Sequence, residues 1–311
     1  MRNPNARARR YVFCYVWSFG ANVHDDSREK FNTFAMGTLA ALIPEDVQGG
    51  NLYEYYVDAD THKMQRWATL MKNFVYNPEL PYFNILVPTI DTTRYSWLSR
   101  LMLENGRNVL VSGETGVGKS VVLADTINDM SSGDDARFVS CAVNFSAQTT
   151  SANLQEVFES KLDKKRKNLL GPPAGKRMIM FVDDLNMPAL EQYGAQPPIE
   201  LLRQVIDQGG FYDREKLFFK NVASCVYAGA CAPPGGGRNE VSPRLLRHYH
   251  MIWVTSLAGS SMARIFTSIL GGYLAVEAPA VLDLATPIVN ATVAMYVAHW
   301  AMPVAVCSAF T

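Results

Sequence analysis

Excess charge and paired cysteines are both missing from this chain of 311 residues. Lys and Arg number 29 and Asp and Glu number 29, so no bulk positive charge is available to hold the protein on nucleic acid. The five cysteines are scattered without a Cys-x-x-Cys pair, which argues against zinc and a disulfide framework and favours a reducing, intracellular setting. With 48% hydrophobic and 19% charged residues, the composition indicates a globular protein with a core.

Neither end carries a complete targeting or membrane signal. An Arg-rich start precedes the apolar run Tyr11–Phe19, as in a secretory or transit peptide, but Asn22–Asp26 is polar and contains no small-residue cleavage site. The segment Ile288–Phe310 is apolar and nearly long enough to span a bilayer, but an Asn, a His and a Pro interrupt it. A buried or incomplete helix is therefore the favoured interpretation there, with a membrane span as the alternative, and no membrane partner is expected.

One glycine-rich motif has every fixed position filled. Residues 113–120 read Gly-Glu-Thr-Gly-Val-Gly-Lys-Ser, the pattern Gly-x-x-x-x-Gly-Lys-[Ser/Thr]. Such a loop wraps a polyphosphate with its backbone N–H groups, while Lys119 reaches the β- and γ-phosphates and the Ser120 hydroxyl binds Mg²⁺. An apolar strand before the loop and a helix after it argue against a chance glycine-rich turn. The predicted nucleotide-binding residues are Gly113, Glu114, Thr115, Gly116, Val117, Gly118, Lys119, Ser120 and Val121.

Short apolar runs alternate with helical stretches from residue 108 onward. Strands separated by helices indicate parallel βαβ units, so an α/β fold with a five-stranded parallel sheet flanked by helices is predicted. Asp91 or Thr92 is the expected cap of a helix before the first strand. The basic run Lys161–Lys167 is interpreted as a solvated helix end or loop rather than as a binding patch. The predicted strands are 108–112, 138–145, 178–182, 222–229 and 249–254.

The third of these strands runs directly into two acids, as in a Walker B element. Asp183 is predicted to hold Mg²⁺, through water, and Asp184 to orient or deprotonate an attacking water. A helix N-cap pair is the alternative. AAA+ ATPases have Glu at the second position, and Asp is one methylene shorter. They often have Asn at the tip of the fourth strand, where this chain has Ala232. We therefore expect a site that binds nucleotide but hydrolyses it slowly or not at all.

Two arginines precede the fifth strand. In a ring ATPase an arginine at this position reaches the γ-phosphate bound by the neighbouring module, and this catalytic role is predicted for Arg244 and Arg247. A pair of surface arginines at the end of a helix is the equally weighted alternative.

Several segments together resemble the third AAA+ module of dynein heavy chains, of the axonemal rather than the cytoplasmic type. The matching segments are Phe181–Pro188, Tyr193–Gln196, Leu202–Tyr212, Ala228–Asn239, Pro243–His248 and Val143–Thr150. Trp17–Ala21 and Ser27–Phe31 look like the closing helical part of the preceding module. The resemblance covers most of residues 11–295 and fades after about residue 304.

The resemblance implies a domain order and a set of partners. Residues 1–45 would end the preceding module, 46–84 form a turn- and strand-rich insertion, 85–256 the large nucleotide-binding domain, and 257–311 the start of a truncated helical lid domain. It implies a regulatory module that binds ATP or ADP with Mg²⁺ and contacts neighbouring AAA+ modules of a motor in the cytoskeleton of the ciliary axoneme. Microtubules would be bound only through regions absent here, and intermediate and light chains would join the full complex.

A self-standing P-loop NTPase or kinase is the alternative function. No Asn-Lys-x-Asp guanine signature appears, which disfavours a GTPase. The arginine pair and the Walker B element favour a member of a ring over a kinase.

Overall fold

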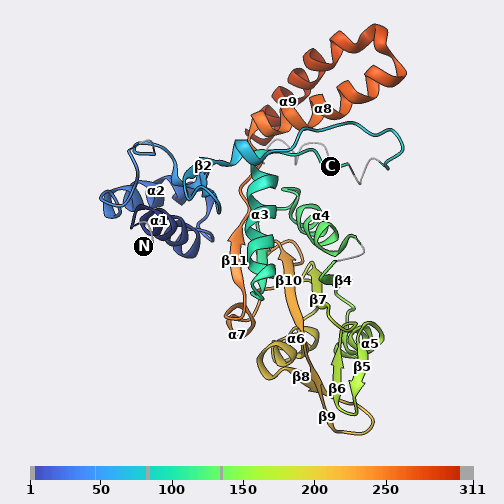
Figure 1. The fold of residues 1–311 in the computed structure, drawn as a ribbon. Coiled ribbons are helices and arrows are strands. Elements are labelled where there is room, and N and C mark those ends of the chain that lie inside the picture. The colour runs from blue at the N-terminus through green and yellow to red at the C-terminus, as the bar shows by residue number, and fades with distance from the viewer. Residues whose placement is uncertain (1–3, 46, 82–84, 134–135, 302–311) are drawn as a thin grey trace. The chain divides into compact units, whose positions relative to one another are not determined.

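A computed structural model describes residues 4–45, 47–81, 85–133 and 136–301 (Figure 1). These residues form two compact units, each treated by itself below. One unit combines the chain up to Met64 with Arg94–Thr255, and the other combines Gln65–Thr93 with the chain from Ser256 onward. The expected fading of the resemblance after about residue 304 concerns residues outside the described ranges.

The first unit is organised around a parallel sheet of five strands in the order β11-β3-β10-β7-β4. This confirms the predicted α/β fold. Strands in the middle of the sheet are buried on both faces: all four residues of β3 and the five central residues of β7 are buried. The strands are β3 (Val109–Ser112), β4 (Phe138–Asn144), β7 (Arg177–Asp183), β10 (Cys225–Cys231) and β11 (His250–Trp253).

Helices connect the strands of this sheet, as parallel pairing requires. In chain order they are α4 (Lys119–Ser131), α5 (Ser151–Lys161), α6 (Pro197–Gln208) and the short α7 (Pro243–Leu246). Helix α6 has prolines in its first turn and ends at Gly209, whose φ of 71° is left-handed.

Helix α3 (Ile90–Glu104) precedes the first strand of the sheet and starts earlier than predicted. The Thr89 hydroxyl accepts from the Thr92 N–H at 3.1 Å, and the Thr92 hydroxyl accepts from the Thr89 N–H at 2.8 Å. This reciprocal arrangement is a capping box in which Thr92 takes the place of the usual Glu. The prediction of Asp91 or Thr92 as the cap was therefore wrong, because the cap is Thr89.

The chain also forms a second, four-stranded sheet, which was not predicted. Its strands come between those of the main sheet in the sequence. Its order is β5-β6-β9-β8, with antiparallel pairing at both ends and parallel pairing between β6 and β9. The basic run forms its edge strand β5, whose four residues are all exposed; it is solvated as expected, but as a strand and not a loop. The strands are β5 (Asp163–Arg166), β6 (Leu169–Gly171), β8 (Gly210–Tyr212) and β9 (Phe219–Val222).

The N-terminal helices belong to the same unit as the main sheet. Arg28 of α2 is buried and donates to the carbonyl of Val23 at 3.2 Å, the hydroxyl of Tyr95 at 3.3 Å and the carbonyl of Trp253 at 2.6 Å. A buried guanidinium requires partners of this kind, and these tie α2 to α3 and β11. The elements of this part are α1 (Pro4–Phe19), α2 (Asp25–Thr38), the 3₁₀ turn η1 (Leu52–Glu54) and β1 (Tyr55–Val57). Strand β1 pairs with β2 (Met64–Arg66), where the chain passes from the first unit to the second, and the 3₁₀ turn η2 (Trp67–Leu70) belongs to the second unit.

The second unit is built mainly from α8 (Gly259–Glu277), the 3₁₀ segment η4 (Pro279–Leu284) and α9 (Ala285–Ala301). The sequence predicted a buried or incomplete helix here; the described part of α9 is largely not buried, since most side chains other than those of Ala285 and Val289 are exposed. By length and hydropathy alone, Pro279–Ala298 meets the criteria for a membrane span, a test that core helices of soluble proteins also pass.

Candidate nucleotide-binding site

A cavity of about 370 Å³ lies at the carboxyl edge of the main sheet, where β3, β7 and β10 end. Ligands bind at this edge in open α/β sheets because the loops that follow parallel strands meet there. Residues from the glycine-rich loop, the β7 end and the β10 end line it together. They are Thr115, Gly116, Gly118, Lys119, Ser120, Val121, Asp183, Asp184, Ala230, Cys231, Ala232 and Arg238.

The glycine-rich loop leads from β3 directly into α4. Gly118 has a φ of 84°, which glycine adopts without strain, and it caps the helix that begins at Lys119. The free N–H groups of this first turn therefore face the cavity edge, as in anion sites at helix N-termini. Six of the nine residues predicted to bind nucleotide line the cavity. Gly113, Glu114 and Val117 shape the loop around it.

Gly113 packs against the backbone of the residue that follows β11. A Cβ at this position would lie 2.6 Å from the carbonyl oxygen of Val254, whose own N–H donates to Ser112 at 2.7 Å. The start of the loop can approach this backbone only because residue 113 has no side chain.

Gly113→Ala is expected to lower the free energy of unfolding by about 1–3 kcal/mol, because the loop or residue 254 must shift to admit the methyl group. Urea denaturation measures the change. Gly259→Ala is the matched control, since a Cβ there meets no atom within 4 Å. A loss no larger than that of the control would contradict this account of the loop.

The side chain of Lys119 is held over the glycine-rich loop by a hydrogen bond to the loop's backbone. Its Nζ donates to the carbonyl oxygen of Glu114 at 2.6 Å. Burial lowers the pKa of Lys119, and the nearby Arg238 charge lowers it too, while Asp183 and Asp184 oppose the shift. The cation is therefore short of solvation, and an anion in the cavity would relieve that deficit.

The two predicted magnesium ligands meet directly. The Ser120 hydroxyl donates to Oδ1 of Asp183 at 2.7 Å, and the same oxygen accepts the backbone N–H of Asp184 at 3.0 Å. Mg²⁺ prefers hard oxygen ligands and is usually held by one or two such side chains together with phosphates and waters. A hydroxyl and a carboxylate beside the phosphate loop fit that requirement.

The groups that would serve hydrolysis are arranged less favourably. Asp184 has a left-handed φ of 50°, and its carboxylate, half exposed, lies 3.8 Å from the guanidinium of Arg238. Ala232 follows the end of β10 and lines the cavity with a methyl group, which cannot hold a water by hydrogen bonding. Its carbonyl accepts from Asn186 Nδ2 at 2.8 Å.

Arg244 and Arg247 do not line this cavity. Their side chains are 68% and 61% exposed and lie beside α6, where Arg244 is 3.9 Å from Glu200 and Arg247 is 3.1 Å from Asp207. The structure therefore leaves them outside the chain's own site, and a role toward a neighbouring module stays a prediction.

Sequence reasoning missed three residues of the cavity, Ala230, Cys231 and Arg238. The thiol of Cys231 is buried beside Lys119, and burial raises its pKa, so it is present as a neutral group. Arg238 follows three glycines, and in the sequence this run contributes only to the family resemblance.

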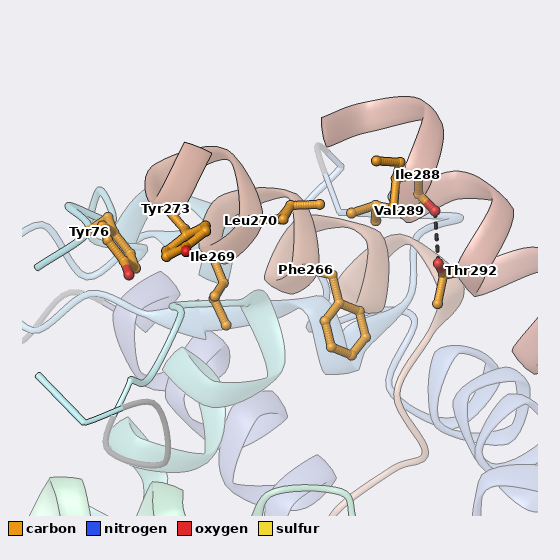
Figure 2. A pocket seen from close by; sticks show the side chains of 8 residues that line it. All are labelled: Tyr76, Phe266, Ile269, Leu270, Tyr273, Ile288, Val289 and Thr292. Atoms are coloured by element: carbon orange, nitrogen blue, oxygen red, sulfur yellow. Dashed lines mark hydrogen bonds between the residues drawn. The ribbon is translucent and has the colours of Figure 1, made fainter. Parts of the chain in front are cut away.

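A second cavity, also of about 370 Å³, lies within the second unit. Figure 2 shows that side chains of α8 and α9 line it together with Tyr76. Its lining is mainly apolar and aromatic, and the hydroxyl of Thr292 donates to the carbonyl of Ile288 at 2.8 Å. None of the residues predicted from the sequence as functional lies in it.

The sheet order, the phosphate loop and the paired acids define a P-loop AAA+ domain. A profile described as the P-loop containing dynein motor region matches residues 74–257, and a profile of the dynein heavy chain AAA lid domain matches residues 4–69. The chain therefore belongs to the dynein heavy chain family, as the resemblance indicated. P-loop domains of this family generally bind nucleotide with Mg²⁺.

Individual relatives are axonemal heavy chains. The chain is 46% identical over 290 residues to human dynein axonemal heavy chain 6, and 36% identical to human dynein axonemal heavy chains 1 and 12 over 320 and 303 residues. Each comparison covers 92% of this chain. The chain spans 7% of the length of heavy chains 6 and 1 and 10% of heavy chain 12.

Proposed function

We propose that this chain contains a regulatory AAA+ module of an axonemal dynein motor, which binds ATP or ADP with Mg²⁺ and hydrolyses ATP slowly or not at all. The 2.7 Å contact between Ser120 and Asp183, in the same cavity as Lys119, is the observation that supports binding most directly. It brings the phosphate-binding cation, a hydroxyl and a carboxylate to one place from two distant parts of the sequence.

Each of these side chains has a distinct task in binding. Lys119 and the N–H groups at the start of α4 supply positive charge and donors to the phosphates. Ser120 and Asp183 would hold Mg²⁺, which neutralises phosphate charge when bound. Arg238 adds a second cation on the cavity wall. Together these groups of the chain would balance the negative charge of a magnesium-bound nucleotide.

Weak hydrolysis follows from the groups that stand where water would be activated. Asp184 is shorter than the Glu found in hydrolytic AAA+ sites, and it faces a cation 3.8 Å away. Ala232 offers no hydrogen bond to a water at the neighbouring strand end. A site with intact binding groups and impaired water activation suits nucleotide sensing better than rapid turnover.

The proposal includes the context of the module. Residues 1–45 would end the preceding module, 46–84 form an insertion, 85–256 the large domain and 257–311 the start of the lid. Neighbouring AAA+ modules of the same heavy chain would be the direct partners, with Arg244 and Arg247 facing one of them. Microtubule-based movement in the ciliary axoneme would depend on other parts of the heavy chain and on intermediate and light chains.

Isothermal titration of the purified chain with Mg·ADP and Mg·ATP tests the binding part of the proposal. We expect both nucleotides to bind with dissociation constants below about 1 mM, which corresponds to about −4 kcal/mol. Circular dichroism verifies that the sample is folded. Retention of neither nucleotide by a folded sample would contradict the proposal, and rapid ATP turnover by the chain alone would contradict slow hydrolysis.

A further inference from the structure

Arg238 has a contact pattern that none of the roles described so far explains. Its guanidinium lines the cavity that contains Lys119, and its Nη2 lies 3.8 Å from Oδ1 of Asp184. The side chain is 24% exposed, and its buried Nε has no hydrogen-bond partner in the described structure. A guanidinium has five N–H donors. A partly buried one beside a phosphate loop therefore keeps donor capacity for an anion.

The backbone around Arg238 is a tight, closed turn. Gly235 and Arg238 exchange two hydrogen bonds of 3.0 Å, from the N–H of each residue to the carbonyl of the other. Gly236 and Gly237 between them have φ values of 56° and 84°, as a type I′ turn requires. Such a turn fixes the direction in which the next side chain leaves the backbone, so the position of Arg238 is built into the glycine run.

The same turn is bonded to the segment that follows the Walker B strand. The N–H of Asn239 donates to the carbonyl of Asn186 at 3.0 Å, and its Nδ2 donates to the carbonyl of Pro188 at 2.8 Å. Asn186 in turn donates to the carbonyl of Ala232 at 2.8 Å. These bonds, before and after Arg238 in the sequence, hold its loop against the segment that begins at Asp184, its partner in the ion pair.

We infer that Arg238 is the residue that distinguishes a nucleoside triphosphate from a diphosphate in this site. The inference rests on the proposed function and deepens it. In the structure as described, the guanidinium has a weak partner: a 3.8 Å contact with a half-exposed carboxylate contributes little. A terminal phosphate is a stronger partner for a planar guanidinium, because it accepts two parallel charge-assisted hydrogen bonds.

The arrangement of the two carboxylates and two cations in the cavity explains why Arg238 would leave Asp184 for a triphosphate but not for a diphosphate. Lys119 and the loop N–H groups already serve the phosphates that ADP and ATP share. Arg238 lies in the loop that follows β10, and not in the glycine-rich loop that carries Lys119. Its charge is therefore available for the additional phosphate of a triphosphate. When Arg238 binds that phosphate, Asp184 loses its cation. When the nucleotide is a diphosphate, the Arg238–Asp184 pair persists.

The test compares Mg·ADP with the Mg complex of β,γ-imido-ATP, which is not hydrolysed, by isothermal titration of the purified chain. Arg238→Gln is expected to weaken the triphosphate analogue by about 10-fold or more, the usual effect of a lost charge-assisted bond, and to change ADP affinity by less than about 2-fold. Arg238→Ala should give the same ratio. Arg238→Lys, which keeps the charge, should recover part of the triphosphate affinity.

ADP binding serves as the fold check within each variant, and Arg166→Ala on the exposed edge strand β5 is the matched arginine control. An equal loss of both ligands in Arg238→Gln and Arg238→Ala, or no loss of either, overturns the inference while the proposed function stands. If the unaltered chain binds neither ligand, both fall together.

Discussion

Lys119→Ala is expected to reduce the affinity for Mg·ADP and Mg·ATP by about 10- to 100-fold, enough to abolish retention of nucleotide through gel filtration. The side chain would supply a positive charge to the phosphates from the wall of the cavity. Burial lowers its pKa in the free protein although Asp183 and Asp184 oppose the shift, so a bound anion would further stabilise the cation.

The substitution should leave the fold intact, because it removes a single bond, from Nζ to the carbonyl of Glu114. Equilibrium dialysis with radiolabelled nucleotide measures the loss, and thermal melting verifies the fold. Lys164→Ala is the matched control, since Lys164 is exposed on β5. Equal retention by Lys119→Ala and by the control would refute the assignment of residues 113–121 as the phosphate loop.

Patterns that depend on neighbours in the sequence predict part of the fold correctly. Strands β3 and β7 are continuous apolar runs because they are buried on both faces, and such runs are visible locally. The phosphate loop is likewise contiguous, with its strand before it and its helix after it. Asp183 lies beside Ser120 because acids at the end of a parallel strand share an edge with the loop after another strand, and the role of both as Mg²⁺ ligands stays a prediction.

Features that depend on pairing between distant segments were missed. Strand β5 reads Asp-Lys-Lys-Arg and carries no apolar alternation, so its pairing with β6 is not visible in the sequence. The predicted strand 222–229 is divided in the structure, since Val222 ends β9 in one sheet and Cys225 begins β10 in the other. Ser224 between them turns the chain with a left-handed φ of 57°.

The position of Arg238 is a further example of a long-range feature. The glycine run predicts a turn, but the direction of the arginine depends on the bonds from Asn239 to Asn186 and Pro188. Those bonds exist because β7 and β10 are neighbours in the sheet, so the loops at their carboxyl ends meet. Sequence spacing alone does not give the strand order, and therefore does not place this residue in the cavity.

Asp184→Glu combined with Ala232→Asn is expected to raise ATP turnover by about 100-fold, the lower range for a correctly placed general base. Under the proposal, the longer carboxylate would extend toward an attacking water that the shorter Asp184 does not reach. The amide at 232 would supply the hydrogen bond that a methyl group cannot. Both positions line the cavity, so both new side chains face the nucleotide. Phosphate release under single-turnover conditions measures the rate.

The single and double variants separate the two causes of weak hydrolysis. Asp184→Glu alone should raise turnover only if the missing amide at 232 is not also limiting, and a gain restricted to the double variant shows that both groups are needed. Lys119→Ala added to the double variant must remove the gain, because activity from this cavity requires bound nucleotide. If neither the single nor the double replacement changes turnover, the shortened acid and the missing amide do not explain a slow site. Arg238, whose guanidinium lies 3.8 Å from the carboxylate of Asp184 and is present in all of these variants, would then be the remaining group to explain slow turnover.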